Sequence, residues 1–370
     1  MKKKLSVFFL SLVLSIGITA CSFLPQTSGA GTSSNDSGLD IVDSSESLEE
    51  ESSTAEEIVS GALSIHFLQL GNATDGDCTL IKTGDTEVLI DAGSTTRSAG
   101  TIVPYIQQYC TDGVLEYVIA THGDQDHIAA FVGSSSYDGI FESFTCGTII
   151  DFPKTTKNTQ IYQEYVSLRD AEVEAGAVHY TALQCWQQTD GAKRSYTLGE
   201  GITMNILYQK YYEVSTSTEN NYSVCMLLSQ GDNHYLFTGD LEKSGEESLV
   251  ASNTLPQCKV YKAGHHGSNT SSTAALLSVI RPEIVVANCC AGGGKYNFPH
   301  QEFIDNVAPY TDKVYIPVVV NGSDYMLMNG NIVVTSSQGE LSVACSNNDT
   351  LLKDTAWFKA NRTMPSSWAS

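Results

Sequence analysis

The sequence predicts an α/β fold, an αββα sandwich in which two mixed β-sheets pack face to face and helices cover their outer faces. Short apolar runs bounded by Gly and Asp are typical of strands, and longer segments with helical spacing separate them. These strand-like and helix-like segments occur twice in the same order, so each half of the chain can form one sheet with its helices. The 370 residues are also enough to bury a core of this size.

The first half starts with three short strands separated by turn residues, which favours an antiparallel meander. Helices and strands alternate after it. The expected elements are strands 65–68, 78–81 and 87–90, helix 101–110, strand 115–120, a strand that ends at 149–151, and helix 159–174.

The second half starts with strands that flank a hairpin turn at Gly231-Asp232-Asn233-His234. The expected elements are strands 202–207, 222–228 and 235–238, helix 241–251, strand 259–262, helix 271–280 and strand 283–287. Four further strands, which we expect to complete the second sheet, are predicted at 315–320, 324–328, 332–335 and 341–345. The last residues, 346–370, contain Trp357, Phe358 and Trp368, so we expect them to pack on the domain, with contact to a partner as the alternative.

The N-terminus has the pattern of an export signal. Three lysines precede an apolar run, 5–18, that is short for a membrane span. The following Ile18-Thr19-Ala20-Cys21 resembles the lipobox of bacterial lipoproteins, in which the signal is cut just before the cysteine and that cysteine is diacylated. We therefore expect an exported protein anchored through Cys21 to the outer face of a bacterial membrane. The alternatives are an ordinary signal with a chance cysteine and an uncleaved anchor.

Charge limits the partners that the sequence favours. Twenty basic and 42 acidic side chains give a net charge of −22. Residues 21–60 carry nine acids and no base among Ser, Thr and Gly, which predicts a flexible acidic tether. Residues 61–370 carry 17 basic and 33 acidic side chains, a net charge of −16, which argues against a broad nucleic-acid-binding surface.

A dense group of metal-ligand side chains follows the apolar strand that ends at Ala120. Within six residues the chain has His122, Asp124, Asp126 and His127. Two imidazoles and two carboxylates are more than one catalytic ion usually takes from a protein, because an open position must remain for water. The pattern therefore predicts a pair of divalent ions, with a polar surface loop as the alternative reading.

Other strand ends carry side chains that can complete such a site. Asp91 and Asp240 each follow a predicted strand, and a segment rich in polar residues follows the strand that ends at Tyr261. That segment contains Lys262, His265, His266 and Ser268. Either aspartate alone is typical of a turn or a helix cap. The ligand-type residues between His122 and His127 make a role in a metal site more plausible for both.

From about residue 61 to 345 the sequence resembles the metallo-β-lactamase fold superfamily, in the branch formed by the hydrolase-like domain of ComEC-type competence proteins. The resemblance rests on several motifs in order: Phe67–Gly71 with Gly76-Asp77, Leu89–Gly93, His122–His127 in the form HxDxDH, Asn221–Val224, Thr238–Asp240, Lys262–Ser268 and Tyr296–His300. The N-terminal patterns and this resemblance together predict a signal peptide over 1–20, a tether over 21–60, a metallo-β-lactamase-like domain over 61–345 and a tail over 346–370.

The resemblance implies a role for each of these positions. His122 and Asp124 would hold one ion, Asp126 and His127 the other, and Asp240 would bridge them. One histidine of the pair at 265 and 266 would complete the ligand set. We assign His265 to the metal and His266 to acid catalysis, although the sequence does not decide between them. Asp91 would orient a ligand histidine through a hydrogen bond.

Two departures from the family pattern affect the ligand set. The histidine expected before the bridging aspartate is absent, and Asn220 or Asn221 occupies that region. Phe298 stands where the last motif usually has histidine, which leaves His300 as a shifted candidate or a helix-start residue. Fewer imidazoles and more carboxylates make the site harder, so both Zn²⁺ and Mn²⁺ are expected cofactors.

The predicted activity is hydrolysis of a phosphodiester by a metal-bound hydroxide near Asp240. Lys262 and Ser268 would bind a phosphate oxygen, unless Lys262 is a solvated residue at a strand end. The substrate would be a nucleic acid, a nucleotide or a cell-wall phosphodiester, and the charge does not favour the first. The alternative is a non-catalytic surface lipoprotein that keeps the fold as a binding module. The sequence does not indicate an oligomeric state.

Overall fold

Eight strands form the first β-sheet of the computed structural model, which describes residues 61–293, 295–321, 324–337 and 339–369. The predicted signal peptide, the predicted tether and Cys21 lie outside these residues. In sheet order the strands are β20 (Glu340–Cys345), β19 (Ile332–Ser337), β1 (Leu63–Phe67), β2 (Thr79–Thr83), β3 (Thr86–Ile90), β4 (Val114–Ile119), β7 (Thr145–Asp151) and β8 (Val178–Thr181). The predicted antiparallel meander is present as β1–β3, and β3, β4, β7 and β8 run parallel.

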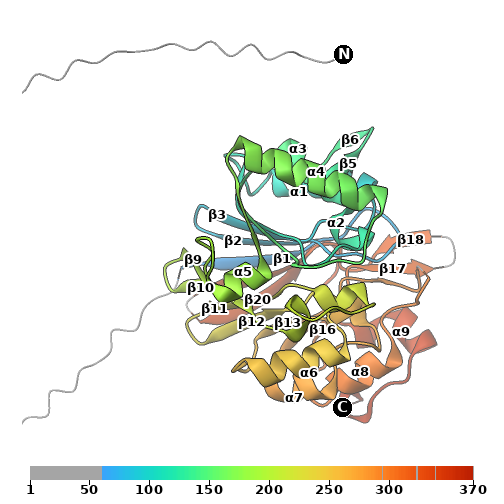
Figure 1. Ribbon diagram of the computed structural model, residues 1–370. Coiled ribbons are helices and arrows are strands. Elements are labelled where there is room, and N and C mark those ends of the chain that lie inside the picture. The colour runs from blue at the N-terminus through green and yellow to red at the C-terminus, as the bar shows by residue number, and fades with distance from the viewer. Residues whose placement is uncertain (1–60, 294, 322–323, 338, 370) are drawn as a thin grey trace, which may run out of the picture. The chain divides into compact units, whose positions relative to one another are not determined.

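Helices cover the outer face of this sheet, at the top of Figure 1. They are α1 (Ala99–Ile106), α2 (Gln125–Val132), α3 (Ile140–Ser143) and α4 (Gln160–Ala175). A short hairpin of β5 (Gly133–Ser134) and β6 (Tyr137–Asp138) follows α2, and α5 (Ala182–Gln187) follows β8. Helix α2 begins inside the ligand-rich loop, because Asp124 is its N-cap and Gln125 its first residue.

Seven strands form the second sheet. In sheet order they are β16 (Val314–Tyr315), β14 (Ile284–Val286), β13 (Val260–Lys262), β12 (Asn233–Phe237), β11 (Cys225–Gln230), β10 (Ile202–Leu207) and β9 (Ser195–Gly199). The hairpin between β11 and β12 turns at Gly231, whose φ of 54° suits glycine. Helices α6 (Lys243–Ser252), α7 (Ala274–Ile280) and α8 (Gln301–Val307) lie on its outer side in Figure 1.

The two sheets share one apolar core. Phe67 of β1 stacks on Phe237 of β12 with ring centroids 6.4 Å apart, and both side chains are buried. A second core, which includes Leu276 and Phe303, lies between the second sheet and its helices. These layers confirm the predicted αββα class. In the described part of the chain no helix is long and apolar enough to cross a membrane.

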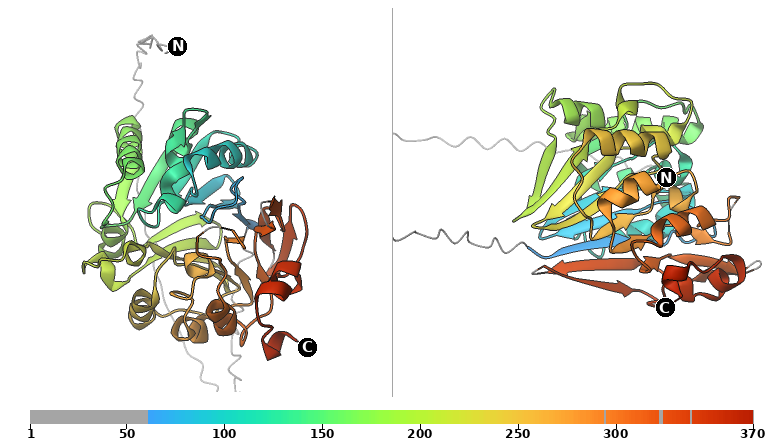
Figure 2. Two further views of the ribbon diagram at one scale, coloured as in Figure 1. Left: turned by 90° about the vertical axis from the view of Figure 1, so that its right-hand side faces the viewer. Right: turned by 90° about the horizontal axis from the view of Figure 1, so that it is seen from below.

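The last strands differ from the prediction. Strand β19 pairs with β1, and β20 pairs with β19, so both extend the first sheet (Figure 2). The expectation that they complete the second sheet was wrong. Alternate residues of β19, Ile332, Val334 and Ser336, are buried, so this strand covers the edge of β1 and adds one face to the core. Strands β17 (Val318–Asn321) and β18 (Asp324–Leu327) form a small sheet with β15 (Cys290–Ala291).

The C-terminal residues that the sequence set apart as a tail belong to the same compact unit as the sheets. Trp357 and Phe358 lie in α9 (Ala356–Asn361), and Trp368 lies just beyond it. All three side chains are buried in the second core. Large aromatic side chains bury much apolar surface, which explains why this segment packs on the domain.

Candidate metal centre

The predicted site residues meet where parallel strands of the two sheets end. Asp91 follows β3 and His122 follows β4, which are neighbours in the first sheet. Asp240 follows β12 and His266 follows β13, which are neighbours in the second. Because parallel strands end at a common edge, four segments far apart in the sequence deliver ligand-type side chains to one place.

Hydrogen bonds fix the orientation of three buried histidines. His127 donates from Nδ1 to Asp91 Oδ2, 2.7 Å away, which is the contact expected of Asp91. His266 Nδ1 donates to the carbonyl oxygen of Asn288 at 2.9 Å. Thr121 Oγ1 donates to Asp91, so it can accept from His122 Nδ1 at 3.1 Å. In each ring the Nε2 atom is buried without a hydrogen-bond partner. Neutral imidazoles in this state present Nε2 lone pairs to a cation.

Two carboxylates face these free nitrogens. Asp240 Oδ2 lies 3.2 Å from His127 Nε2 and 3.3 Å from His266 Nε2. Asp126 Oδ2 lies 3.4 Å from His266 Nε2. Ligand atoms about 2.1 Å from a tetrahedral ion are about 3.4 Å from one another, so these spacings are those of one coordination sphere. The donor set therefore fits a divalent metal ion.

Charge in the centre also matches a cation site. Burial alone would raise the pKa of Asp240, but His127, His266 and His265 hold it well below its ordinary value. Burial alone would lower the pKa of His127, but Asp240 and Asp91 raise it well above its ordinary value. Burial alone would also lower the pKa of His266, but Asp240 and Asp77 raise it well above its ordinary value. A cation bound here would take over the role of these protons and displace them.

The structure distinguishes the two adjacent histidines. His266 is buried and its Nε2 faces Asp240 and Asp126. His265 Nε2 is 3.9 Å from Asp240, and its Nδ1 contacts Thr270 Oγ1 at 2.9 Å. The geometry favours His266 as the ligand in place of His265, to which the sequence had assigned the metal.

Asp77 is a site residue to which the sequence analysis gave no role, although it quoted Gly76-Asp77 as a motif. Ligand-type atoms of Asp77, His127, Asp240 and His266 lie within 4.8 Å of one another. Its carboxylate lies behind the rings, 3.3 Å from His266 Nδ1 and 3.7 Å from His127 Nδ1. It pairs with the buried ammonium of Lys262. Burial opposes ionisation of Asp77, but Lys262 and His266 lower its pKa to about 2.

Four predicted site residues bond to neighbouring groups of the protein and do not face the cations. Lys262 is neither solvated nor directed to a substrate cavity, because its partner is Asp77. Ser268 Oγ accepts from Thr270 N within its own loop. Asn221 Oδ1 accepts from the backbone of Glu242, and it is Asn220 whose amide lies beside His265. His300 is the N-cap of α8, and its Nδ1 accepts from Asn269 N, so it is a helix-start residue.

A cavity of about 260 Å³ opens beside the centre. Its lining includes Asp126, His265, His266, Lys295, Tyr296 and Phe298. Asp126 is the most exposed of the facing ligand-type groups, with 39% of its side chain accessible, so a substrate can reach the centre past it. Thr74, Asp75, Ser94, Thr95 and Gln125 also line the cavity, so polar residues make up most of its wall.

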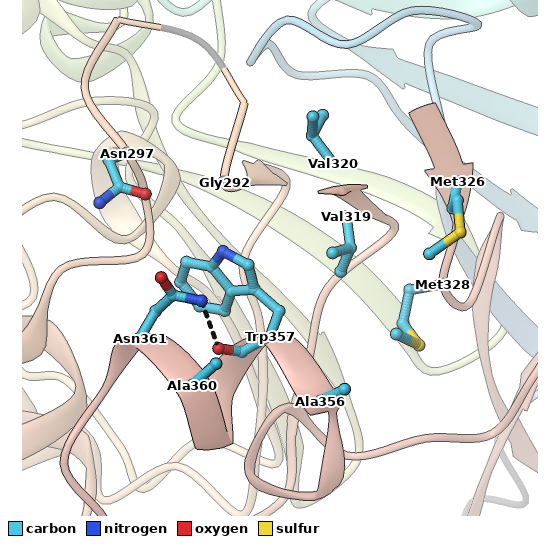
Figure 3. Close-up of a pocket in the computed structure, with 10 residues that line it drawn as sticks. All are labelled: Gly292, Asn297, Val319, Val320, Met326, Met328, Ala356, Trp357, Ala360 and Asn361. Atoms are coloured by element: carbon cyan, nitrogen blue, oxygen red, sulfur yellow. Dashed lines mark hydrogen bonds between the residues drawn. The ribbon is translucent and has the colours of Figure 1, made fainter. Parts of the chain in front are cut away.

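A larger cavity of about 500 Å³ lies beside α9 (Figure 3). Val319 and Val320 of β17, the two methionines near β18 and Trp357 surround it, and the amides of Asn297 and Asn361 face it from the other side. None of its lining residues is titratable. It therefore offers apolar surface but no acid, base or metal ligand, and the chemistry belongs to the smaller cavity.

A metallo-β-lactamase fold with an Asp- and His-rich centre at the strand ends defines the class of this protein. Residues 71–133 and 215–287 match the sequence model described as the metallo-beta-lactamase superfamily. These ranges contain all the ligand-type residues of the centre. Three relatives are also similar to this chain in sequence.

Recombination protein 2 of Haemophilus influenzae is 28% identical over 247 residues, which are 65% of this chain and 26% of the relative. Competence protein ComA of Neisseria gonorrhoeae is 29% identical over 224 residues, 59% of this chain and 26% of the relative. ComE operon protein 3 of Bacillus subtilis is 25% identical over 202 residues, 54% of this chain and 23% of the relative. The chain thus spans about a quarter of the length of these relatives.

Solved structures match this chain at low sequence identity and low TM-score. The metallo-beta-lactamase fold protein YhfI from Bacillus subtilis is 12% identical, with a TM-score of 0.42 over 75% of this chain and all of the other. A diphosphatase from the PhnP family is 10% identical, with a TM-score of 0.36 over 69% of this chain and 94% of the other.

Proposed function

We propose that this protein is a metal-dependent hydrolase of phosphodiesters. The single observation that carries the proposal is the convergence of unpartnered, buried Nε2 atoms on the carboxylates of Asp240 and Asp126, beside an open cavity. Leaving such groups unpaired is costly for folding alone, so their arrangement points to a bound cation.

Some residues of this chain bind the cation, and others orient its ligands. His127, His266, Asp240 and Asp126 hold the cation, which when bound supplies Lewis-acid activation of water and of a phosphoryl oxygen. Asp91 and the Asn288 carbonyl keep two of the imidazoles in the tautomer that presents Nε2. The remaining ligand-type groups of the loop, His122 and Asp124, lie 3.5 Å apart beside them.

His265 presents a neutral imidazole at the cavity. Burial lowers the pKa of His265 to about 4, although Asp240 opposes the shift. The ring is therefore neutral near pH 7, and with Thr270 engaging Nδ1, Nε2 is the nitrogen that lies nearer to Asp240. In this proposal the neutral His265 accepts a hydrogen bond from the attacking water, because an imidazole with a pKa of about 4 is a weak base, and acid catalysis by His266 is given up because His266 is a ligand.

The substrate is a phosphodiester held locally at the cavity. The names of two relatives refer to recombination and competence, which supports a nucleic acid or a nucleotide as the substrate. The net charge of −16 over residues 61–370 supports a short or small substrate over a long duplex. Export and anchoring of the chain at the outer face of a membrane through Cys21 are part of the proposal and rest on the sequence pattern.

A second candidate is a non-catalytic binding module that keeps one metal. It is favoured by the absence of the histidine expected before Asp240, where Asn220 and Asn221 stand, and by Phe298 in the last motif. In that case the centre would bind a cation without turning over any substrate.

The test is a substrate screen of the metal-reconstituted protein across DNA, RNA, cyclic nucleotides, choline-phosphate esters and a chromogenic phosphodiester. We expect metal-dependent cleavage that Asp126→Ala reduces by more than about a hundredfold. Asp138→Ala, an exposed aspartate in β6, is the matched control and should keep full activity. Unchanged cleavage by Asp126→Ala would refute the mechanism, and a bound metal without any cleavage would support the binding module.

A further inference from the structure

The half of the centre formed by His122 and Asp124 is short of ligands. His122 Nε2 has one acidic neighbour within 4.0 Å in the described chain, Asp124 Oδ2 at 3.5 Å. The histidine expected before Asp240 is absent, and neither residue of that region supplies an imidazole: Asn220 donates its amide to Glu242 Oε1, and Asn221 Oδ1 accepts from Glu242 N. A catalytic metal ion usually has three protein ligands, and His122 and Asp124 supply two. This half is therefore a poor cation site.

A lysine already neutralises the carboxylate of this half. Lys157 Nζ forms an ion pair with Asp124 Oδ1. Both side chains are only about a quarter exposed, 28% for Lys157 and 27% for Asp124. The ammonium is thus a positive charge bound to the residue that the family pattern would use as a metal ligand.

The position of Lys157 is built into the fold and is more than a flexible surface contact. Buried Glu219 accepts hydrogen bonds from Thr155 Oγ1 at 2.6 Å and from the backbone and hydroxyl of Thr156 at 2.6 and 2.7 Å. The same carboxylate accepts from Gly123 N at 3.1 Å. Glu219 therefore ties the segment that carries Lys157 to the backbone between His122 and Asp124.

Close packing against Gly123 strengthens this link. A Cβ atom added to Gly123 would lie 3.3 Å from Lys157 Cγ and 2.8 Å from Glu219 Oε1. The lysine stem thus runs directly over the loop that holds the ligand-type residues. Only a residue without a side chain leaves room for it there.

We propose that the ammonium of Lys157 replaces the divalent ion that the family pattern places beside His122 and Asp124. The centre then binds one divalent ion where the family pattern implies two. The ion is held by His127, His266, Asp240 and Asp126, and a second divalent ion beside Asp124 would be repelled by Lys157. The inference relies on the proposed function only for the presence of that one ion.

The test is the metal stoichiometry of the full chain, stripped with a chelator and dialysed against excess Mn²⁺ or Zn²⁺. We expect about one ion per chain by mass spectrometry, and the Mn²⁺ electron paramagnetic resonance spectrum of an isolated ion. Lys157→Met should bind a second ion and show a spin-coupled pair. Lys157→Arg keeps the charge and should stay at one ion. The control Lys154→Met, in the same segment with its ammonium on the Glu213 carbonyl, should also stay at one.

Two ions in the unaltered chain would overturn the inference and leave the proposed hydrolase intact. A folded Lys157→Met that still binds one ion would overturn it as well, and a raised KM alone in that variant would instead assign Lys157 to the substrate. Circular dichroism shows whether each variant folds. If Lys157→Met does not fold, the number of ions in the unaltered chain decides the inference by itself. No ion in the unaltered chain would instead overturn the proposed function.

Discussion

Asp91→Asn is the perturbation that tests most directly how the second layer of the centre acts. The Asp91 carboxylate is buried and accepts three hydrogen bonds, from Thr121 N at 2.7 Å, Thr121 Oγ1 at 2.8 Å and His127 Nδ1 at 2.7 Å. Asp91 has a φ of 58°, a left-handed conformation that asparagine also adopts readily. The substitution therefore removes the charge without adding backbone strain.

The expected magnitude follows from the tautomer of His127. An asparagine oxygen can still accept the hydrogen bond from Thr121 N. Its amide nitrogen then faces His127 Nδ1, and an amide nitrogen cannot accept a hydrogen bond from the Nδ1 proton. His127 would have to carry its proton on Nε2, the atom 3.2 Å from Asp240 Oδ2. A protonated Nε2 cannot bind a metal, so we expect a loss of about 10–100-fold in affinity, or about 1.4–2.7 kcal/mol.

Competition against a chromogenic chelator at neutral pH measures this loss. The matched control is Asp151→Asn at the end of β7, where Asp151 Oδ1 lies 2.9 Å from His179 Nε2 and the other oxygen pairs with Arg169. It removes a buried, histidine-bonded carboxylate outside the centre, so the metal affinity should not change. If Asp91→Asn folds and keeps the affinity of the unaltered chain, the tautomer argument is refuted.

Two further predictions concern stability. Burial lowers the pKa of His66 from 6.5 to about 4, so the unfolded chain binds the proton first and the free energy of unfolding should fall by up to about 3 kcal/mol as the pH drops from 6.5 to 4. Urea unfolding of His66→Gln should show a flatter profile there, and an equal slope would contradict the assignment. Lys262→Met leaves Asp77 buried without its partner and should cost about 3–5 kcal/mol, measured by urea unfolding of the metal-free chain. Lys262→Met combined with Asp77→Leu should recover most of that loss, and a cost below about 1 kcal/mol for the single variant would contradict the buried pair.

Local patterns made much of the fold predictable. Apolar runs such as 87–90 and 115–120 match β3 and β4 to within a residue or two, because strand length and turn residues are encoded nearby in the sequence. The final strands were placed in the wrong sheet for the complementary reason. The pattern of residues 332–335 shows that they form a strand, whereas its partner is β1, more than 260 residues earlier.

The candidate site follows the same division. The sequence by itself determined that Asp91, His122 and Asp240 follow strands closely, since their spacing to the apolar runs fixes this. It also placed Asp126 and His127 a few residues after His122, where the structure begins α2. It could not choose between His265 and His266, because adjacent residues differ in direction only once the backbone of their loop is folded.

Only the tertiary structure brought Asp77 to Lys262 across 185 positions and Lys157 to Asp124. Neither lysine has a local signal, since a lysine at a strand end or in a polar segment is usually solvated. Their partners are set by how the two sheets and the segment held by Glu219 pack together. The sequence determined which chemical groups reach the centre from their own strands, and the packing decided which charges surround them.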